Sequence, residues 1–227
     1  MCSISFVKDI LYPYALKKAQ ELLPTVNFPP TGSGELESHL AAFPAEATHS
    51  SAALLSHMAE LTAKDVKAPY LKALQGFLWK EGYASGEITV DLFPDAALAI
   101  DRWSHKFQSS EFGPASGVYI YSSGSVAAQK LLFGHTRQGD LNHLLKGYFD
   151  TVNAGPKTEK TSYEKIADAI GLPGAEIRFF SDNPAEITAA EAAGWETVFT
   201  VRPGNAPAPA NFKPKGLVAT NFDNVSI

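Results

Sequence analysis

Thiols, basic charge and long apolar runs are all scarce in this chain of 227 residues. Cys2 is the only cysteine, which excludes a disulfide framework and a thiolate zinc cluster. Lysine and arginine number 19 against 24 aspartates and glutamates, so the net charge is −5. That balance offers no general positive field to nucleic acid or to an anionic membrane, although a local pocket for an anionic substrate remains compatible with it.

Membrane and metal signatures are missing as well. No run of about 18 apolar residues predicts a membrane-spanning helix, and residues 1–9 lack the apolar centre of a signal peptide. The six histidines show no His-x-x-x-His spacing, so we expect them on the surface or in packing positions. We therefore expect a soluble intracellular protein with no nucleic-acid or membrane partner.

The chain does contain enough apolar material for a core, since 45% of its residues are hydrophobic. Residues 10–90 show apolar side chains at helical spacing and predict helices only, with a Pro/Gly-rich loop over 24–34. We expect Asp9 to cap the first helix. Further helices are predicted over 50–63 and from Pro69 to a stop at Gly82.

The second half changes its pattern. Pro94 opens an amphipathic helix, and a polar loop follows over 108–117. Short β-branched or aromatic runs then alternate with helical segments, which predicts a doubly wound parallel sheet of the α/β class. The predicted strands are 118–121, 148–152, 176–180 and 196–201, and the predicted helices are 126–134, 140–146, 161–170 and 184–193.

A hydroxyl-rich turn follows the first predicted strand. Ser122, Ser123 and Gly124 stand between that strand and the helix over 126–134. Backbone N–H groups at a helix start, together with two hydroxyls, are compatible with a phosphate cradle. The alternative is an ordinary N-cap, because serines often begin helices without any ligand.

Two more strand ends carry polar groups. Lys157 follows the second predicted strand, and Asp182 with Glu186 one helical turn later follows the third. The carboxyl ends of parallel strands share one edge of a sheet, so we expect these groups near the serines. Lys157 would neutralise phosphate and Asp182 would hold a divalent cation, with Glu186 as a ligand or an outer partner. The alternatives are a solvated loop lysine and a helix cap at Asp182.

The order serine, lysine, aspartate on successive strand ends resembles the haloacid-dehalogenase superfamily of phosphohydrolases. Longer stretches are similar to the enolase-phosphatases of methionine salvage, and the resemblance spans essentially the whole chain. The stretches are Ile4-Ser5-Phe6-Val7-Lys8-Asp9, Leu74-Gln75-Gly76, Tyr119-Ile120-Tyr121-Ser122-Ser123-Gly124-Ser125, Gln129-Lys130-Leu131-Leu132-Phe133-Gly134 and Val201-Arg202-Pro203-Gly204-Asn205-Ala206.

The resemblance implies a Rossmann-like core with an inserted helical cap. We place the core at residues 1–9 and 96–227, and the cap at residues 10–95. It implies Mg²⁺ and a small phosphorylated diketone, 2,3-diketo-5-methylthiopentyl-1-phosphate, which is enolised and then dephosphorylated to the acireductone. Ser122, Ser123 and Lys157 match substrate-binding residues, and Asp182 matches a metal ligand. A monomer in the cytoplasm, and also in the nucleus, is implied as well.

One motif of the family is not found among the 227 residues. The family begins with an apolar strand that ends in Asp-Ile-Glu-Gly-Thr. Its Asp is the nucleophile and a Mg²⁺ ligand, and its Glu binds Mg²⁺ or serves as acid/base. Met1-Cys2-Ser3 stand where this motif would just have ended, which suggests a truncated sequence, and Asp9 is no substitute. We expect residues 1–227 alone to fold poorly and to be inactive, and the alternative function is a non-catalytic phosphate-binding pseudoenzyme.

Overall fold

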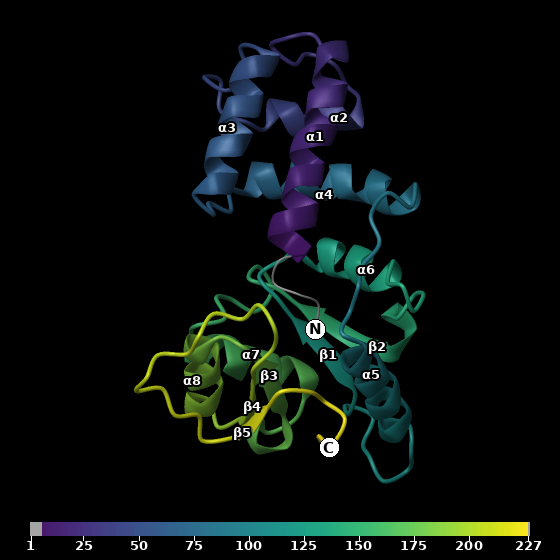
Figure 1. Cartoon of the computed structure of the whole chain (residues 1–227), viewed down its shortest axis with the longest axis vertical. Coiled ribbons are helices and arrows are strands. Elements are labelled where there is room, and N and C mark those ends of the chain that lie inside the picture. The colour runs from purple at the N-terminus through teal and green to yellow at the C-terminus, as the bar shows by residue number, and fades with distance from the viewer. Residues whose placement is uncertain (1–5, 227) are drawn as a thin grey trace. The chain divides into compact units, whose positions relative to one another are not determined.

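The computed structural model describes residues 6–226, which fall into two compact units (Figure 1). One unit is helical and runs to Thr89. The α/β unit begins at Val90, whose N–H donates to His135 O at 3.0 Å. The division therefore lies a few residues before the predicted limit at 95/96, and Phe6–Asp9 belong to the helical unit.

The helical unit holds four α-helices and two shorter helical turns within the described residues. They are η1 (Phe6–Leu11), α1 (Tyr12–Leu22), η2 (Leu23–Thr25), α2 (Glu35–Ala41), α3 (Ser51–Ala63) and α4 (Pro69–Ala84). α1 packs on both α3 and α4, and α2 packs on α4. Leu40, Leu54, Leu74 and Leu78 are buried between these helices and form the core of the unit.

Two predicted helix limits in this unit are wrong. Asp9 does not cap a helix, because it already lies inside the π-helical turn η1 that leads directly into α1. Gly82 does not end α4, which continues to Ala84. A side chain at Gly82 would begin 2.6 Å from Cζ of Tyr14, so close packing is the physical reason for this glycine. The helix α2 was not predicted.

The α/β unit alternates strands with helices. Its elements are α5 (Pro94–Phe107), β1 (Val118–Tyr121), α6 (Val126–Gly134), η3 (Asn142–Leu144), β2 (Leu145–Phe149), α7 (Lys160–Ile170), η4 (Gly174–Glu176), β3 (Arg178–Ser181), α8 (Pro184–Ala192), β4 (Glu196–Thr200) and β5 (Leu217–Ala219). Every strand pair is parallel, which confirms the predicted α/β class.

Some limits differ from the prediction. The second strand is Leu145–Phe149 and a single turn, η3, replaces the predicted helix over 140–146. Burial does not alternate along this strand, since its last three residues are all half-buried, and such a pattern is too weak to fix the strand ends. β5 was not predicted, because the strand is short and follows a loop rather than a helix. Its Leu217 and Val218 are exposed.

Helices cover both faces of the three-stranded sheet. Phe179 of β3 packs with Tyr163, Ile187 and Trp195 in a core formed with α7 and α8. The next residue, Phe180, packs from the opposite face against Trp103 and Phe222. This alternation with period two is the pattern of a doubly wound sheet.

The sheet is divided into two parts. β1 pairs with β2, and β3, β4 and β5 pair in that order, but among the described residues β1 and β3 share no ladder. A cavity of about 570 Å³ is lined by residues of β1 and β3 and by Ile100, Trp103 and Ile166. We call this cavity the strand slot, because both of its walls are edges of parallel strands.

Candidate active site

The sequence-predicted residues follow strands in the α/β unit. β1 ends at Tyr121 and is followed by Ser122, and β3 ends at Ser181 and is followed by Asp182. β2 ends at Phe149, whose carbonyl accepts the Ser122 N–H at 3.1 Å. Parallel pairing puts the carboxyl ends of β1 and β2 on one edge of their sheet, and those of β3 and β4 on one edge of the other sheet.

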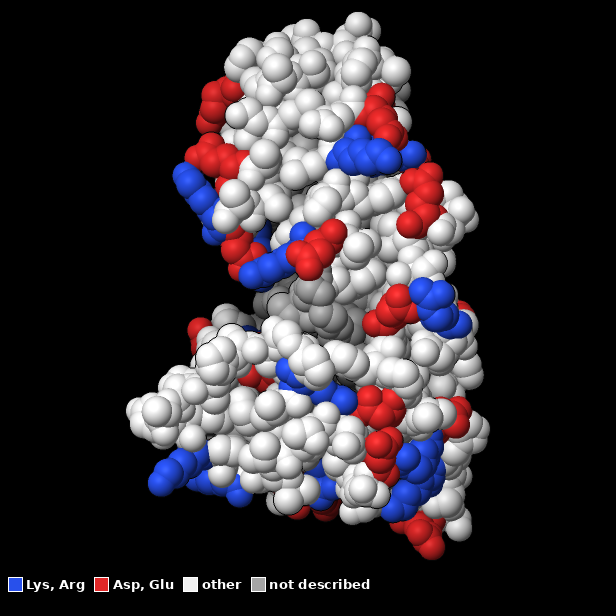
Figure 2. All heavy atoms as spheres, viewed as in Figure 1, with Lys and Arg blue, Asp and Glu red and all other residues white. Residues whose placement is uncertain are grey.

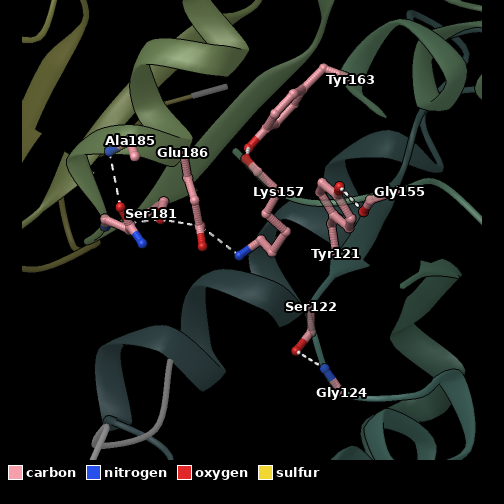
Figure 3. A network of polar contacts seen from close by, with 10 residues as sticks. Tyr121, Ser122, Gly124, Gly155, Lys157, Tyr163, Ser181, Ala185 and Glu186 are labelled. Carbon is pink, nitrogen blue, oxygen red and sulfur yellow. Dashed lines mark hydrogen bonds and ion pairs between the residues drawn. The ribbon is translucent and has the colours of Figure 1, made fainter. Parts of the chain in front are cut away.

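The serine loop is shaped by its own hydrogen bonds. Gly124 N–H donates to Oγ of Ser122 at 3.2 Å (Figure 3), and Ala128 N–H donates to Oγ of Ser125 at 3.2 Å. The N-cap of α6 is therefore Ser125. The cap interpretation is wrong for Ser122 and Ser123, and both hydroxyls stand before the helix, in the loop where a phosphate would be expected.

A buried carboxylate that sequence reasoning missed reinforces this loop. Asp150, directly after β2, accepts the Val126 N–H of the first turn of α6 at 2.9 Å, and its other oxygen accepts from Val152 N–H at 2.8 Å. The positive end of α6 thus already faces an acidic group of the protein. An anion at this helix start would therefore meet the Asp150 carboxylate as well as helix N–H groups.

Lys157 is an enclosed cation at the strand-end edge. Its Nζ lies 2.6 Å from Oε2 of Glu186, and the two side chains are only 18% and 14% exposed (Figure 3). The ammonium also lies 5.6 Å from the ring centroid of Tyr121 and 5.5 Å from that of Phe179. The interpretation as a solvated lysine is therefore wrong, because the group is enclosed by a carboxylate and two aromatic faces.

The backbone around Lys157 is held by two tyrosines. Tyr163 OH donates to the carbonyl of Lys157 at 2.6 Å, and Tyr121 OH donates to the carbonyl of Gly155 at 2.8 Å (Figure 3). Burial raises the pKa of Tyr163 and also that of Tyr121, so both phenols stay protonated and remain donors near neutral pH. Gly155 has φ of +115°, a conformation that favours glycine and turns the chain into the site.

Glu186 is directed by Ser181 as well as by the lysine. Oγ of Ser181 donates to Oε2 of Glu186 at 2.7 Å and accepts the Asn183 N–H at 3.1 Å. Glu186 makes no hydrogen bond to Asp182 among the described residues. The carboxylate of Glu186 thus contacts the lysine, and its predicted place beside a cation remains a prediction.

Asp182 is not a helix cap. Asn183 caps α8, accepting the Ala185 N–H at 2.9 Å. The Asp182 carboxylate instead accepts a hydrogen bond from the side-chain amide of Asn205, which was not predicted. Within residues 6–226 no cluster of three acidic, histidine or cysteine side chains could hold a metal ion. One carboxylate nevertheless fits Mg²⁺, which in proteins relies on one or two carboxylates with water and substrate oxygens.

The charges elsewhere are mixed. On the face drawn in Figure 2, lysines and arginines lie among aspartates and glutamates, and no extended field of one sign is visible there. Within residues 6–226 no helix is both long enough and apolar enough to cross a bilayer.

Comparison with known proteins gives long matches. No family model matches the chain. The enolase-phosphatase E1 of Yarrowia lipolytica is 48% identical over 231 residues, which cover 100% of this chain and 96% of that protein. The enolase-phosphatase E1 of Chaetomium globosum is 45% identical, with 99% of this chain and 93% of that protein covered.

Solved structures agree in fold. The crystal structure of the UTR4 protein of Saccharomyces cerevisiae has a TM-score of 0.81 at 39% identity, covering 99% of this chain and 95% of that one. CbbY of Rhodobacter sphaeroides, solved in complex with phosphate, has a TM-score of 0.57 at 11% identity, covering 99% of this chain and 91% of that one. The second likeness shows the fold alone. From the identity and near-complete coverage of its relatives, the chain belongs to the enolase-phosphatase E1 family.

Proposed function

We propose that this chain is an enolase-phosphatase that acts on 2,3-diketo-5-methylthiopentyl-1-phosphate in methionine salvage, with the helical unit as its cap. The single observation that carries the proposal is the enclosed Lys157–Glu186 pair at the strand-end edge of the α/β unit. Its support is identity of 45–48% to enolase-phosphatases over nearly the whole chain.

Lys157 would bind the substrate phosphate. A lysine held between a carboxylate and two rings is pre-oriented, so little side-chain entropy is lost when phosphate arrives. Its charge would stabilise the negative charge that develops on the phosphoryl oxygens. Ser122 and Ser123 would add hydroxyl donors from the loop after β1.

Asp182 would hold Mg²⁺ at this edge. A bound Mg²⁺ would neutralise charge on the phosphoryl group and order it for in-line attack. The attacking carboxylate is expected from the Asp-Ile-Glu-Gly-Thr strand. Its oxygen would bond to phosphorus while the bond from phosphorus to the substrate's ester oxygen breaks, and water would then hydrolyse the aspartyl-phosphate and release phosphate. The strand slot between β1 and β3 supports this expectation, because its walls are two parallel strand edges that lack a shared neighbour among the described residues.

The test uses the completed protein, by which we mean residues 1–227 preceded by an apolar strand and Asp-Ile-Glu-Gly-Thr. We expect Mg²⁺-dependent release of phosphate from the diketone phosphate, loss of activity with excess chelator, and almost no activity in Asp182→Asn. Full turnover in excess chelator would exclude the metal role of Asp182. Phosphate binding without any turnover would instead indicate a non-catalytic phosphate-binding protein.

We also propose a monomer that resides in the cytoplasm and the nucleus, on the basis of the family resemblance alone. Size-exclusion chromatography with light scattering tests the first statement, and imaging of a fluorescent fusion tests the second.

A further inference from the structure

The carboxylate of Asp182 is held by a residue distant in sequence. The side-chain amide of Asn205, in the loop after β4, donates to Oδ2 of Asp182. Among the described residues the carboxylate has no other hydrogen-bond donor. One oxygen of Asp182 is therefore fixed, and the other is left available for a different partner.

The orientation of the Asn205 amide is determined by its surroundings. Its carbonyl oxygen Oδ1 accepts the backbone N–H of Arg202, which leaves only the NH₂ group to face the aspartate. Residues 202–205 form a β-turn in which Asn205 N–H donates to Arg202 O at 3.0 Å and Gly204 has φ of +87°. Pro203 and Gly204 occupy the positions that favour these residues in a type II turn.

This turn is anchored in the core by Arg202. The Arg202 side chain is only 8% exposed, and its guanidinium forms an ion pair with Asp95 of α5 and donates to Thr220 O at 3.0 Å. It lies 4.9 Å from the ring centroid of Phe93 and 4.5 Å from that of Phe222. The backbone that carries Asn205 is thus fixed by buried contacts on several sides, so the amide presents its donor from a rigid support.

We propose that Asn205 is a positioning residue that holds the Asp182 carboxylate in the orientation required to bind a divalent cation. The inference rests on the proposed function, in which Asp182 is a Mg²⁺ ligand. A ligating carboxylate whose hydrogen-bond partner is removed rotates more freely and loses affinity for its metal, and such outer partners are typically worth 10- to 100-fold in metal affinity. Asn205 touches neither substrate nor metal in this role.

Calorimetric titration of the completed protein with Mg²⁺ alone tests the inference. Asn205→Ala and Asn205→Ser, whose hydroxyl is one atom shorter than the amide, are both expected to weaken Mg²⁺ binding at least about tenfold. Loss of the acceptor of the Arg202 N–H should lower the melting temperature of both variants, whereas saturating Mg²⁺ should restore most of kcat. Asn221→Ala is the matched control, because Asn221 is exposed and its side chain binds only the Asp223 N–H, at 3.1 Å, among residues 6–226.

The outcomes separate the two claims. If Asp182→Asn abolishes Mg²⁺ binding while both Asn205 variants bind like the parent, the positioning role is wrong and the proposed function stands. If Asp182→Asn binds Mg²⁺ like the parent, the metal site itself is misplaced and both claims are overturned. A tenfold loss in both Asn205 variants but not in Asn221→Ala supports the positioning role.

Discussion

Enclosure distinguishes Lys157 from the other lysines of the α/β unit. Lys160 and Glu164, three and seven residues further along, form an i,i+4 ion pair whose side chains are 54% and 45% exposed. Lys157 and Glu186 are 18% and 14% exposed. Water screens the first pair and screens the second much less, so only the second can act strongly on a bound anion.

Replacing Lys157 by alanine should therefore reduce kcat/KM of the completed protein at least about 30-fold, which corresponds to about 2 kcal/mol. The phosphate would lose its charge-assisted partner, and the Glu186 carboxylate would repel it. Steady-state phosphate release measures the effect. Lys160→Ala is the matched control and should behave like the parent, and equal kinetics in both variants would show that Lys157 does not bind the phosphate.

At the scale of elements, Gln129 of α6 joins the serine loop to β2. Its side-chain amide donates to Gly124 O and to Phe149 O, both at 2.9 Å, and the residue is 5% exposed. Phe149 O also accepts the Ser122 N–H, whereas Gly124 O depends on the glutamine. The loop after β1 is thereby held against the end of β2 by one buried side chain.

Gln129→Ala should lower the free energy of unfolding by about 1.5 kcal/mol, because a buried carbonyl loses its donor while helix propensity is kept. Urea denaturation measures this change. Gln138→Ala, at an exposed position in the loop after α6, is the control and should leave the free energy unchanged. Equal stability of both variants would mean that the loop does not depend on Gln129.

A second contact between elements, the ion pair of Asp95 with Arg202, joins α5 to the turn after β4. Burial alone would raise the pKa of Asp95, but the hydrogen bond from Arg202, the Phe222 N–H and the charge of Arg202 together lower that pKa below its usual 3.8. The ionised form is thus favoured by folding. Its contribution to stability is complete above the unfolded pKa and is lost as the pH falls through the folded one.

The difference in unfolding free energy between the parent and Asp95→Asn should accordingly be constant above about pH 5 and shrink below about pH 4. Denaturation at a series of pH values measures it. Asp91→Asn is the control, since Asp91 pairs with Arg137 at the surface with side chains 65% and 67% exposed, and should have little effect at any pH. A pH-independent difference for Asp95→Asn would contradict the assignment.

At the scale of the whole molecule, the main feature of the α/β unit is the strand slot between its two half-sheets. Two half-sheets lie on either side of a cavity of about 570 Å³ within the α/β unit. Backbone N–H and C=O groups along β1 and β3 would gain ladder partners from one additional parallel strand. The free energy contributed by a strand buried on both faces is large compared with the net stability of a domain, because typical domains are stable by only about 5–15 kcal/mol.

The completed protein should therefore melt cooperatively at a higher temperature than residues 1–227 and release phosphate with Mg²⁺, while residues 1–227 alone should show no turnover. Calorimetry and a phosphate assay measure both. A completed protein with proline in the middle of the added strand is the control, because proline cannot donate to the ladder. Cooperative melting and comparable turnover of residues 1–227 would refute this account and require another nucleophile.

The sequence by itself determined the family, the helical first half and the alternation of strands and helices. It also placed Ser122, Lys157 and Asp182 after strands, because strand ends and helix starts are set by local patterns and parallel strands share an edge. The limit at Gly82 failed because packing against Tyr14 explains that glycine, and the limits of β2 failed because its local pattern is weak. The limit at Asp9 failed because the chain is already helical there.

Only the tertiary structure decided which side chains meet. The pairing of Lys157 with Glu186, the amide of Asn205 on Asp182, and the buried Asp150 at the start of α6 join residues 29, 23 and 24 positions apart, respectively. Contacts of this range depend on how helices pack on the sheet, and no local pattern encodes them. The division of the sheet into two parts is likewise not encoded by a local pattern, because a strand lies at an edge when it lacks a neighbour, whatever its own residues are.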